Sequence, residues 1–342
     1  MIKKSITALL FAVLCGILIA VGGEKPAVFG NPAGGGNKLV VYTSMKESLM
    51  GDIVKGFKKK HPGIEVDYQS AGAGRLMAAI AEERRGGRIL ADIIWTSEVP
   101  DFYNMKKDGI LENYKTPLFN ELLNPFDDYD GYFTAARLGT LGVAVNTNRI
   151  KTPPVQWSDL FKPEYKNAFG IADPSLSGTA YMSVALLVKQ FGWEFFEKLR
   201  ANGARIGRGS DRVIDDTVSG ELAACLAVDY ITSDKITKGA SINLHYPPEL
   251  LVVPSPVAIF KDTRNLDAAK NFVDYLLSAE AQAVIAKEGT LPVRRDVKVP
   301  EKFKMPDAAD ALKRSIKIDY LQMMATKEET VKRFTDILQG AR

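Results

Sequence analysis

After about residue 37 the chain alternates short apolar runs with segments of helical spacing. The first runs have the length of buried strands and comprise residues 38–42 (KLVVY), 64–68 (IEVDY) and 91–95 (ADIIW). Between the first two, apolar residues from Leu49 to Phe57 recur at helical spacing, and Pro62-Gly63 ends that helix. Strands that alternate with helices over short loops form parallel sheets covered on both faces. The pattern therefore predicts an α/β fold.

A second series of the same kind follows in the second half of the chain. Further strands are expected at 139–145, 169–172, 204–206, 223–228 and 242–246, with a last strand that begins at 257. Helices are expected at 178–191, 211–219, 266–277 and 279–287 and through the tail, 306–342. About 300 residues exceed the size at which a single core usually divides, so two α/β units are expected.

The N-terminus has the order of a secretory signal. Lys3 and Lys4 precede an uncharged apolar run over 6–21, and Gly22 and Gly23 follow it. Residues 1–23 are therefore predicted to be a signal peptide and residues 24–37, which are rich in Gly and Pro, a linker. The alternative is a retained membrane anchor, because about 18 apolar residues suffice to span a bilayer.

Composition and motifs exclude several classes of function. The net charge of +4 is spread along the chain, which does not indicate nucleic-acid binding. Cys225 would be alone once the signal containing Cys15 is removed, and no metal-spaced Cys/His cluster or HExxH motif occurs. GxSxG, GxxxxGK[ST] and GxGxxG are absent from plausible contexts. No enzymatic activity and no cofactor are expected.

Six segments in order resemble one family. They are LVVYTS, HPGIEVDYQSAGAG, ADIIWTS, LGVAVNTNRI, WSDLFKPEYKNAFGIADPSLSGTAY and AKNFVDYLLSAEAQAVIAKEGTLPVR. Together they run from about Lys38 to Arg294 and resemble the substrate-binding proteins of bacterial ABC importers. The resemblance is nearest to the branch that contains ferric-ion, thiamine, sugar-phosphate and phosphonate binders. Each segment is weak alone; the ordered set identifies the superfamily but does not identify the ligand.

The resemblance implies a type II periplasmic-binding-protein fold, with two parallel-sheet lobes joined by a two-strand hinge. The crossovers are expected at 143–148 and 254–259. Lobe one would comprise 38–145, completed by 258–342, and lobe two 146–257. The ligand would lie in the cleft and be delivered to an ABC permease in the inner membrane. A monomeric protein, exported to the periplasm or the extracellular space, is expected.

Candidate ligand contacts of lobe two follow predicted strands and precede predicted helices. Ser177, Gly178 and Thr179 form one such loop, and Arg208 and Ser210 belong to another. Free N–H groups and the dipole at a helix N-terminus attract anions, hydroxyls add donors, and an arginine can fork onto an oxyanion. The alternatives are a plain helix cap and, for Arg208, an exposed side chain.

Candidate contacts of lobe one lie at the carboxyl ends of strands, where open α/β sheets bind ligands. Ser44, Thr96 and Ser97 follow the first and third strands, and Ala73 lies in the 70–74 loop. Ser255 lies in the predicted return crossover. Simple turn chemistry is the alternative for these hydroxyls.

Asp229-Tyr230 bears on the ligand class. In ferric-binding relatives, a tyrosine pair near this place supplies phenolate ligands. Here only Tyr230 is aromatic, and no metal site is expected unless the ligand is iron, which would then use Tyr230 and Asp229. The residues favour a small anionic solute: an organophosphate, a sugar phosphate or a phosphonate. Ferric ion is the alternative, and a membrane-tethered sensor domain is the second alternative.

Overall fold

Strands from both halves of the chain form one continuous sheet. The computed structural model describes residues 38–317 and 319–340, so the predicted signal and linker lie outside the described residues. The strands are β1 (Lys38–Thr43), β2 (Glu65–Ser70), β3 (Ile93–Trp95), β4 (Thr134–Asn146), β5 (Phe169–Ala172), β6 (Arg205–Gly207), β7 (Ala224–Val228), β8 (Ile242–His245) and β9 (Leu251–Ile259). Within these residues their order is β2-β1-β3-β9-β4-β7-β5-β6, and β8 pairs with β4.

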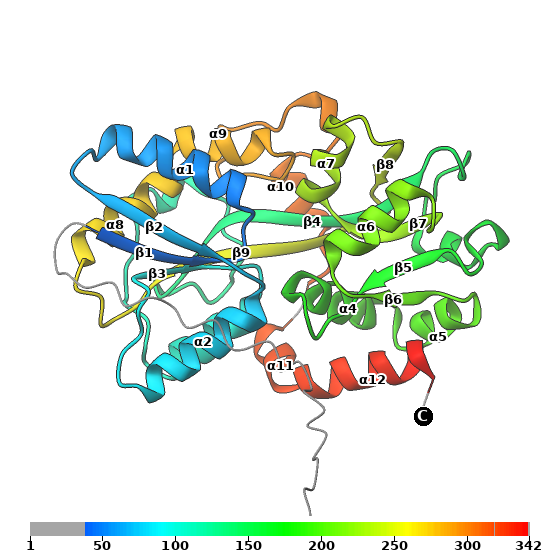
Figure 1. Ribbon diagram of the computed structural model, residues 1–342, viewed down its shortest axis with the longest axis horizontal. Coiled ribbons are helices and arrows are strands. Elements are labelled where there is room, and N and C mark those ends of the chain that lie inside the picture. Colours follow the sequence, from blue (N-terminus) through cyan, green and yellow to red (C-terminus); the bar gives the residue numbers. More distant parts are fainter. Residues whose placement is uncertain (1–37, 318, 341–342) are drawn as a thin grey trace, which may run out of the picture. The chain divides into compact units, whose positions relative to one another are not determined.

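Helices cover both faces of the sheet (Figure 1). They are α1 (Glu47–Lys60), α2 (Ala73–Arg85), α3 (Val99–Lys107), α4 (Gly178–Phe191), α5 (Glu194–Ala201), α6 (Ser210–Ser219), α7 (Asp229–Thr237), α8 (Leu266–Leu276), α9 (Ala279–Lys287), α10 (Ala308–Arg314), α11 (Tyr320–Ala325) and α12 (Lys327–Gln339). Short 3₁₀ turns lie at Phe119–Glu121, Trp157–Phe161, Pro163–Tyr165 and Glu301–Phe303.

The two halves repeat the same parallel arrangement. In the first, β1 pairs in parallel with β2 and β3, and α1 buries Leu49, Ile53 and Phe57 against the core. In the second, β5 pairs in parallel with β6 and β7. All residues of β5 and β7 are buried because helices cover both faces of these strands. The predicted α/β class is confirmed.

Two long antiparallel strands, β4 and β9, join the halves. They pair from Thr134↔Val257 to Leu141↔Leu251 and lie side by side through the centre of Figure 1. Beyond that stretch β9 pairs with β3, whereas β4 pairs with β7 and β8. Every residue of both strands is buried. Both strands begin earlier than the sequence predicts: β4 starts at Thr134 and β9 at Leu251.

Three helices were not predicted from the sequence, namely α3, α5 and α7. Helix α7 buries Asp229, Tyr230, Thr232 and Ser233, so no apolar stripe marks it in the sequence. The predicted helical tail is divided into α10, α11 and α12. Helix α11 packs against α3, whereas α12 packs against α4 and α5, elements of the segment assigned to lobe two. The division of the chain into lobes by residue number stays a prediction.

Candidate functional site

A cavity of about 400 Å³ opens where the carboxyl ends of six strands meet. On one side, Ser44 and Ser97 follow β1 and β3, and Ser70 is the last residue of β2. On the other side, the lining residues follow β5, β6 and β7 in the same way. These are Leu176, Ser177, Gly178, Thr179, Gly209, Ser210, Asp211, Tyr230 and Ile231. The strands of the two halves run antiparallel to one another on either side of β4 and β9, so their carboxyl ends face each other and both halves contribute to one site.

Eight of the twelve candidate residues line this cavity. They are Ser44, Ala73, Ser97, Ser177, Gly178, Thr179, Ser210 and Tyr230. The other four lie elsewhere: Arg208 is exposed, and Thr96, Asp229 and Ser255 are fully buried behind the cavity wall. The Thr96 hydroxyl has no hydrogen-bond partner within the described residues. A role in ligand binding stays a prediction for all twelve.

Helices α2, α4 and α6 each direct an N-terminus at the cavity. Helices α2 and α6 begin after Gly72 and Gly209, and neither has a side-chain cap. Helix α4 is capped by Ser177, whose Oγ accepts from Ala180 N at 3.3 Å and lies 3.3 Å from Ser210 Oγ. The first N–H groups of a helix have no intrahelical acceptor, so three sets of backbone donors converge here.

Gly178 has a structural role that the sequence did not show. A Cβ at this position would lie 2.7 Å from Glu98 Oε2 and 2.9 Å from Glu98 Cβ. Glu98 is buried and pairs with Lys327 of α12. The absence of a side chain at Gly178 therefore lets α4 approach the start of α3, and substitution there would disturb this packing whether or not a ligand is bound.

Charged residues of the cavity were missed in the sequence. Lys46 and Lys235 line it, as do Asp211 and Asp234. Lys46 pairs with Glu288, lies 3.8 Å from Asp234, and its Nζ is 5.7 Å from the ring centroid of Tyr230. Lys235 pairs with Asp215 at 2.5 Å, and this hydrogen bond raises the pKa of Lys235. The sequence could have indicated Lys46 as a cavity residue, because it lies two residues after Ser44 at the end of a predicted strand.

Asp229 lies behind the wall with its hydrogen-bonding capacity occupied. Its Oδ2 accepts from Thr140 N (2.7 Å), Thr140 Oγ1 (3.0 Å) and Thr290 Oγ1 (2.8 Å). Its Oδ1 accepts from Tyr230 N at 2.6 Å and lies 3.8 Å from Arg137 Nη1. Burial raises the pKa of Asp229, and the nearby guanidinium opposes that shift. Both carboxylate oxygens are engaged in these contacts, and Asp229 does not line the cavity.

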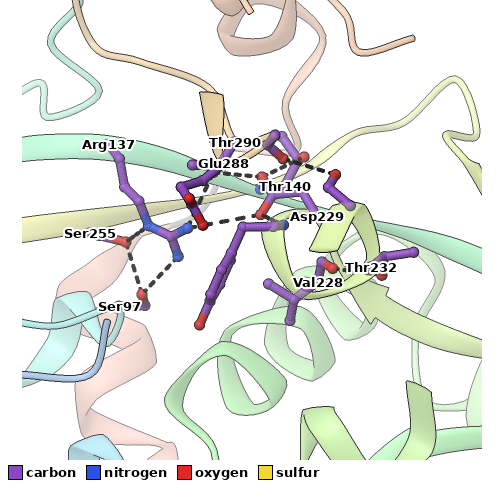
Figure 2. A network of polar contacts seen from close by, with 12 residues as sticks. Ser97, Arg137, Thr140, Val228, Asp229, Thr232, Ser255, Glu288 and Thr290 are labelled. Carbon is purple, nitrogen blue, oxygen red and sulfur yellow. Dashed lines mark hydrogen bonds and ion pairs between the residues drawn. The ribbon is translucent and has the colours of Figure 1, made fainter. Parts of the chain in front are cut away.

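Arg137, also missed in the sequence, is the buried cation of this network (Figure 2). The pairing of β4 with β9 shifts register between Ala135 and Arg137, and a bulge of this kind re-aims side chains. Gln282 Nε2 donates to Ala136 O at 2.8 Å, which satisfies the bulged carbonyl. A Cβ at Gly139 would lie 3.2 Å from Arg137 Nη2, so this glycine leaves room for the guanidinium.

Tyr230 separates the cavity from Arg137. Its ring lines the cavity, and the Arg137 guanidinium carbon lies 4.6 Å from the ring centroid. Burial raises the pKa of Tyr230, while Arg137 opposes the shift. A phenolate ligand therefore carries a desolvation cost at this position.

Two further observations concern only residues 38–317 and 319–340. No group of three or more His, Cys, Asp or Glu side chains there is placed to hold a metal ion. None of the helices in those residues has the length and apolar character needed to cross a membrane.

Comparisons with known proteins agree on one family. The family model described as bacterial extracellular solute-binding protein matches residues 89–322. A Salmonella typhimurium protein that carries the provisional name of a 2-aminoethylphosphonate-binding periplasmic protein is 23% identical over 250 residues, 70% of this chain and 72% of that one. The major ferric iron-binding protein of Neisseria meningitidis serogroup B is 25% identical over 268 residues, 72% of this chain and 78% of that one.

A solved structure extends the likeness to the whole fold. The periplasmic binding protein AfuA from Actinobacillus pleuropneumoniae, with exogenous fructose-6-phosphate bound, superimposes with a TM-score of 0.76 at 25% identity. The superposition covers 89% of this chain and 99% of that one. The predicted two-lobe periplasmic-binding-protein fold is thereby confirmed.

Proposed function

Because the chain belongs to the bacterial extracellular solute-binding protein family, we propose that its cavity captures a small organic anion with a phosphate or phosphonate group. Relatives of this chain are periplasmic solute-binding proteins that serve transport. The family role is solute binding for transport, to which we add the chemical class of the solute. It further holds that the exported protein is a monomer without catalytic activity and that it delivers the ligand to an ABC permease.

One observation carries the ligand class: the N-termini of α2, α4 and α6 converge on a single cavity. Hydroxyls of Ser44, Ser97 and Thr179 stand beside these backbone donors. Lys46 adds a cation whose side chain is about a quarter exposed (26%). A phosphoryl group offers several anionic oxygens at once, so it matches a cavity rich in donors and positive partial charge.

The cavity also offers acceptors for the rest of such a ligand. Asp211 and Asp234 line it, and their carboxylates can accept hydrogen bonds from a hydroxyl or pair with an ammonium group. The relatives named for 2-aminoethylphosphonate and solved with fructose-6-phosphate combine these two kinds of group in their ligands. This combination supports an organic phosphate or phosphonate over inorganic phosphate.

Ferric ion, suggested by the Neisseria relative, fits the cavity less well. Tyr230 is the tyrosine among the residues that line the described cavity, and burial raises its pKa. Asp229, the second expected oxygen ligand, is enclosed by five hydrogen-bonding and ionic contacts and does not line the cavity. Ferric ion prefers several hard, ionised oxygen donors. The alternative of a tethered sensor domain depends on the N-terminus, which lies outside the described residues.

Thr179→Ala is expected to weaken binding of the ligand about ten- to a hundredfold. The change removes one hydroxyl that lines the cavity, and a hydrogen bond to a charged group contributes about 1.5–3 kcal/mol. Calorimetric titration with fructose 6-phosphate and with 2-aminoethylphosphonate measures the effect. Thr335→Ala, which removes a hydroxyl that bonds Val331 O on α12, is the matched control and should leave affinity unchanged.

Tyr230→Phe separates the two ligand classes when ferric ion is titrated alongside the two anions. For an organic phosphate or phosphonate, loss of the phenol costs at most one hydrogen bond, about 0.5–3 kcal/mol. For ferric ion it removes a coordinating oxygen and should abolish binding. Wild-type-like binding by Thr179→Ala, together with lost binding by Tyr230→Phe, would refute the proposed ligand class.

A further inference from the structure

The cavity wall at Ser97 connects directly to the buried Arg137. Ser97 lines the cavity although the residue is only 5% exposed. Its Oγ lies 3.3 Å from Arg137 Nη2 and 2.8 Å from Ser255 Oγ (Figure 2). Ser97 is thus the point at which a fully enclosed polar network reaches the ligand space.

Arg137 fixes the direction of the hydrogen bonds around it because a guanidinium only donates. Its Nε donates to Ser255 Oγ at 3.0 Å, its Nη1 to Thr290 Oγ1 at 3.2 Å, and its Nη2 to Ser97 Oγ. Thr290 then donates its own proton to Asp229 Oδ2 at 2.8 Å. Each hydroxyl around the guanidinium is therefore an acceptor toward Arg137 and must place its own proton elsewhere.

The proton of Ser255 has one acceptor. Ser255 is fully buried, and within residues 38–317 and 319–340 its hydroxyl has two polar partners, Arg137 and Ser97. Arg137 cannot accept, so Ser255 donates to Ser97. The reverse direction would leave the Ser255 proton unpaired in the core, which costs about 1–3 kcal/mol.

Ser97 consequently accepts two hydrogen bonds, from Arg137 and from Ser255. A serine hydroxyl has two acceptor positions and one donor, so both acceptor positions are filled and its own proton remains. Because the rest of the side chain is enclosed, that proton is directed into the cavity. We propose that Arg137 and Ser255 are positioning residues that make Ser97 an obligate hydrogen-bond donor to an anionic oxygen of the ligand. This inference rests on the proposed function and extends it to selectivity.

An obligate donor selects the kind of ligand atom that it contacts. An unprotonated oxygen of a phosphate or phosphonate can accept from Ser97, whereas an ammonium group or a hydroxyl in need of an acceptor gains nothing there. The hydroxyl or ammonium end of the ligand is then left to Asp211 and Asp234. The network therefore sets the orientation of the ligand in the cavity.

A double-mutant cycle tests the connection between Ser255 and Ser97. Calorimetry with fructose 6-phosphate and with 2-aminoethylphosphonate gives affinities for wild type, Ser97→Ala, Ser255→Ala and the double variant. Ser97→Ala should lose about ten- to a hundredfold in affinity. Ser255→Ala lets the Ser97 hydroxyl rotate and should lose about three- to tenfold, but less than about twofold when Ser97 is already alanine.

The control is Thr116→Ala, which removes another buried hydroxyl, one that donates to Asp274 Oδ1 at 2.8 Å and does not line the cavity. It should leave affinity within about twofold of wild type. Equal losses for Ser255→Ala in both backgrounds, or no loss in either, would overturn the role of Ser255 while the proposed ligand class stands. If the wild-type protein binds neither probe, the proposed ligand class itself fails, and the inference fails with it.

Discussion

Arg137→Met is expected to lower the free energy of unfolding by about 3–5 kcal/mol. The substitution keeps an unbranched side chain in the core but removes the only cation near Asp229 within the described network, 3.8 Å from its Oδ1. Arg137 and Asp229 are 1% and 0% exposed, so water cannot replace the lost partner. Removing one member of a buried pair leaves an uncompensated charge, which costs far more than the pair contributes as a whole. Urea denaturation of the purified variant measures the effect.

Two further variants identify the cause of that loss. Lys60→Met breaks the exposed pair Lys60–Glu280, at 2.9 Å, and should cost less than about 1 kcal/mol. The double variant Arg137→Met/Asp229→Asn removes both charges and should recover about 2 kcal/mol relative to Arg137→Met. A loss for Arg137→Met no larger than that of Lys60→Met would contradict the view that β4, β9 and α7 are held around a buried ion pair.

Asp101→Asn is expected to remove a pH dependence of stability between about pH 4 and pH 7. Burial, together with the charge of Glu98, raises the pKa of Asp101 from 3.8 to about 7, and Lys327 opposes the shift. Asp101 Oδ2 is buried without a hydrogen-bond partner among the described residues. Between the two pKa values the folded state binds the proton and the unfolded state does not. Stability therefore falls as pH rises through this window, by up to about 1.4 kcal/mol per pH unit.

The measurement is urea denaturation of wild type and Asp101→Asn at several pH values from about 4.5 to 8. Groups that titrate in both proteins cancel in the difference between their free energies of unfolding. This difference should increase in favour of the variant as pH rises and become constant above about pH 7. Asp310→Asn, at an exposed pair with Arg314, is the control and should parallel wild type. If the free energies of unfolding of Asp101→Asn and wild type differ by the same amount at every pH in this range, Asp101 is ionised throughout.

The elements that the sequence predicted best are those with one strong local pattern. The run ACLAV in β7 and the long helix α4 were placed within a residue because a buried strand and an apolar helix each carry their own period. Helix α7 was missed because it buries Asp229 and Thr232 in place of an apolar stripe, and the partners that satisfy Asp229, Thr140 and Thr290, are distant in the sequence. Packing of α12 against α4 is a long-range contact that no local pattern encodes.

The same distinction applies to the site. Ser44, Ser97 and Ser210 were found because each follows a predicted strand, and open α/β sheets bind ligands at the carboxyl ends of their strands. Arg208 and Asp229 follow strands too, but one is exposed and the other is enclosed, because side-chain direction depends on the turn that follows. Arg137 lies within a strand, where a single charged residue in an apolar run gives no indication of the partners that neutralise it.

The ligand class of the cavity is tested directly by titrating the purified protein with sugar phosphates, phosphonates and ferric ion, followed by calorimetry and thermal melting. A ligand that binds only the folded state stabilises it by about 2.7 kcal/mol at a hundred times its Kd, so true binding raises the melting temperature. We expect at least one phosphorus-containing anion to bind with one-to-one stoichiometry and to raise the melting temperature, and ferric ion to do neither. Binding of ferric ion, with no heat and no shift in melting temperature from any of the anions, would contradict it.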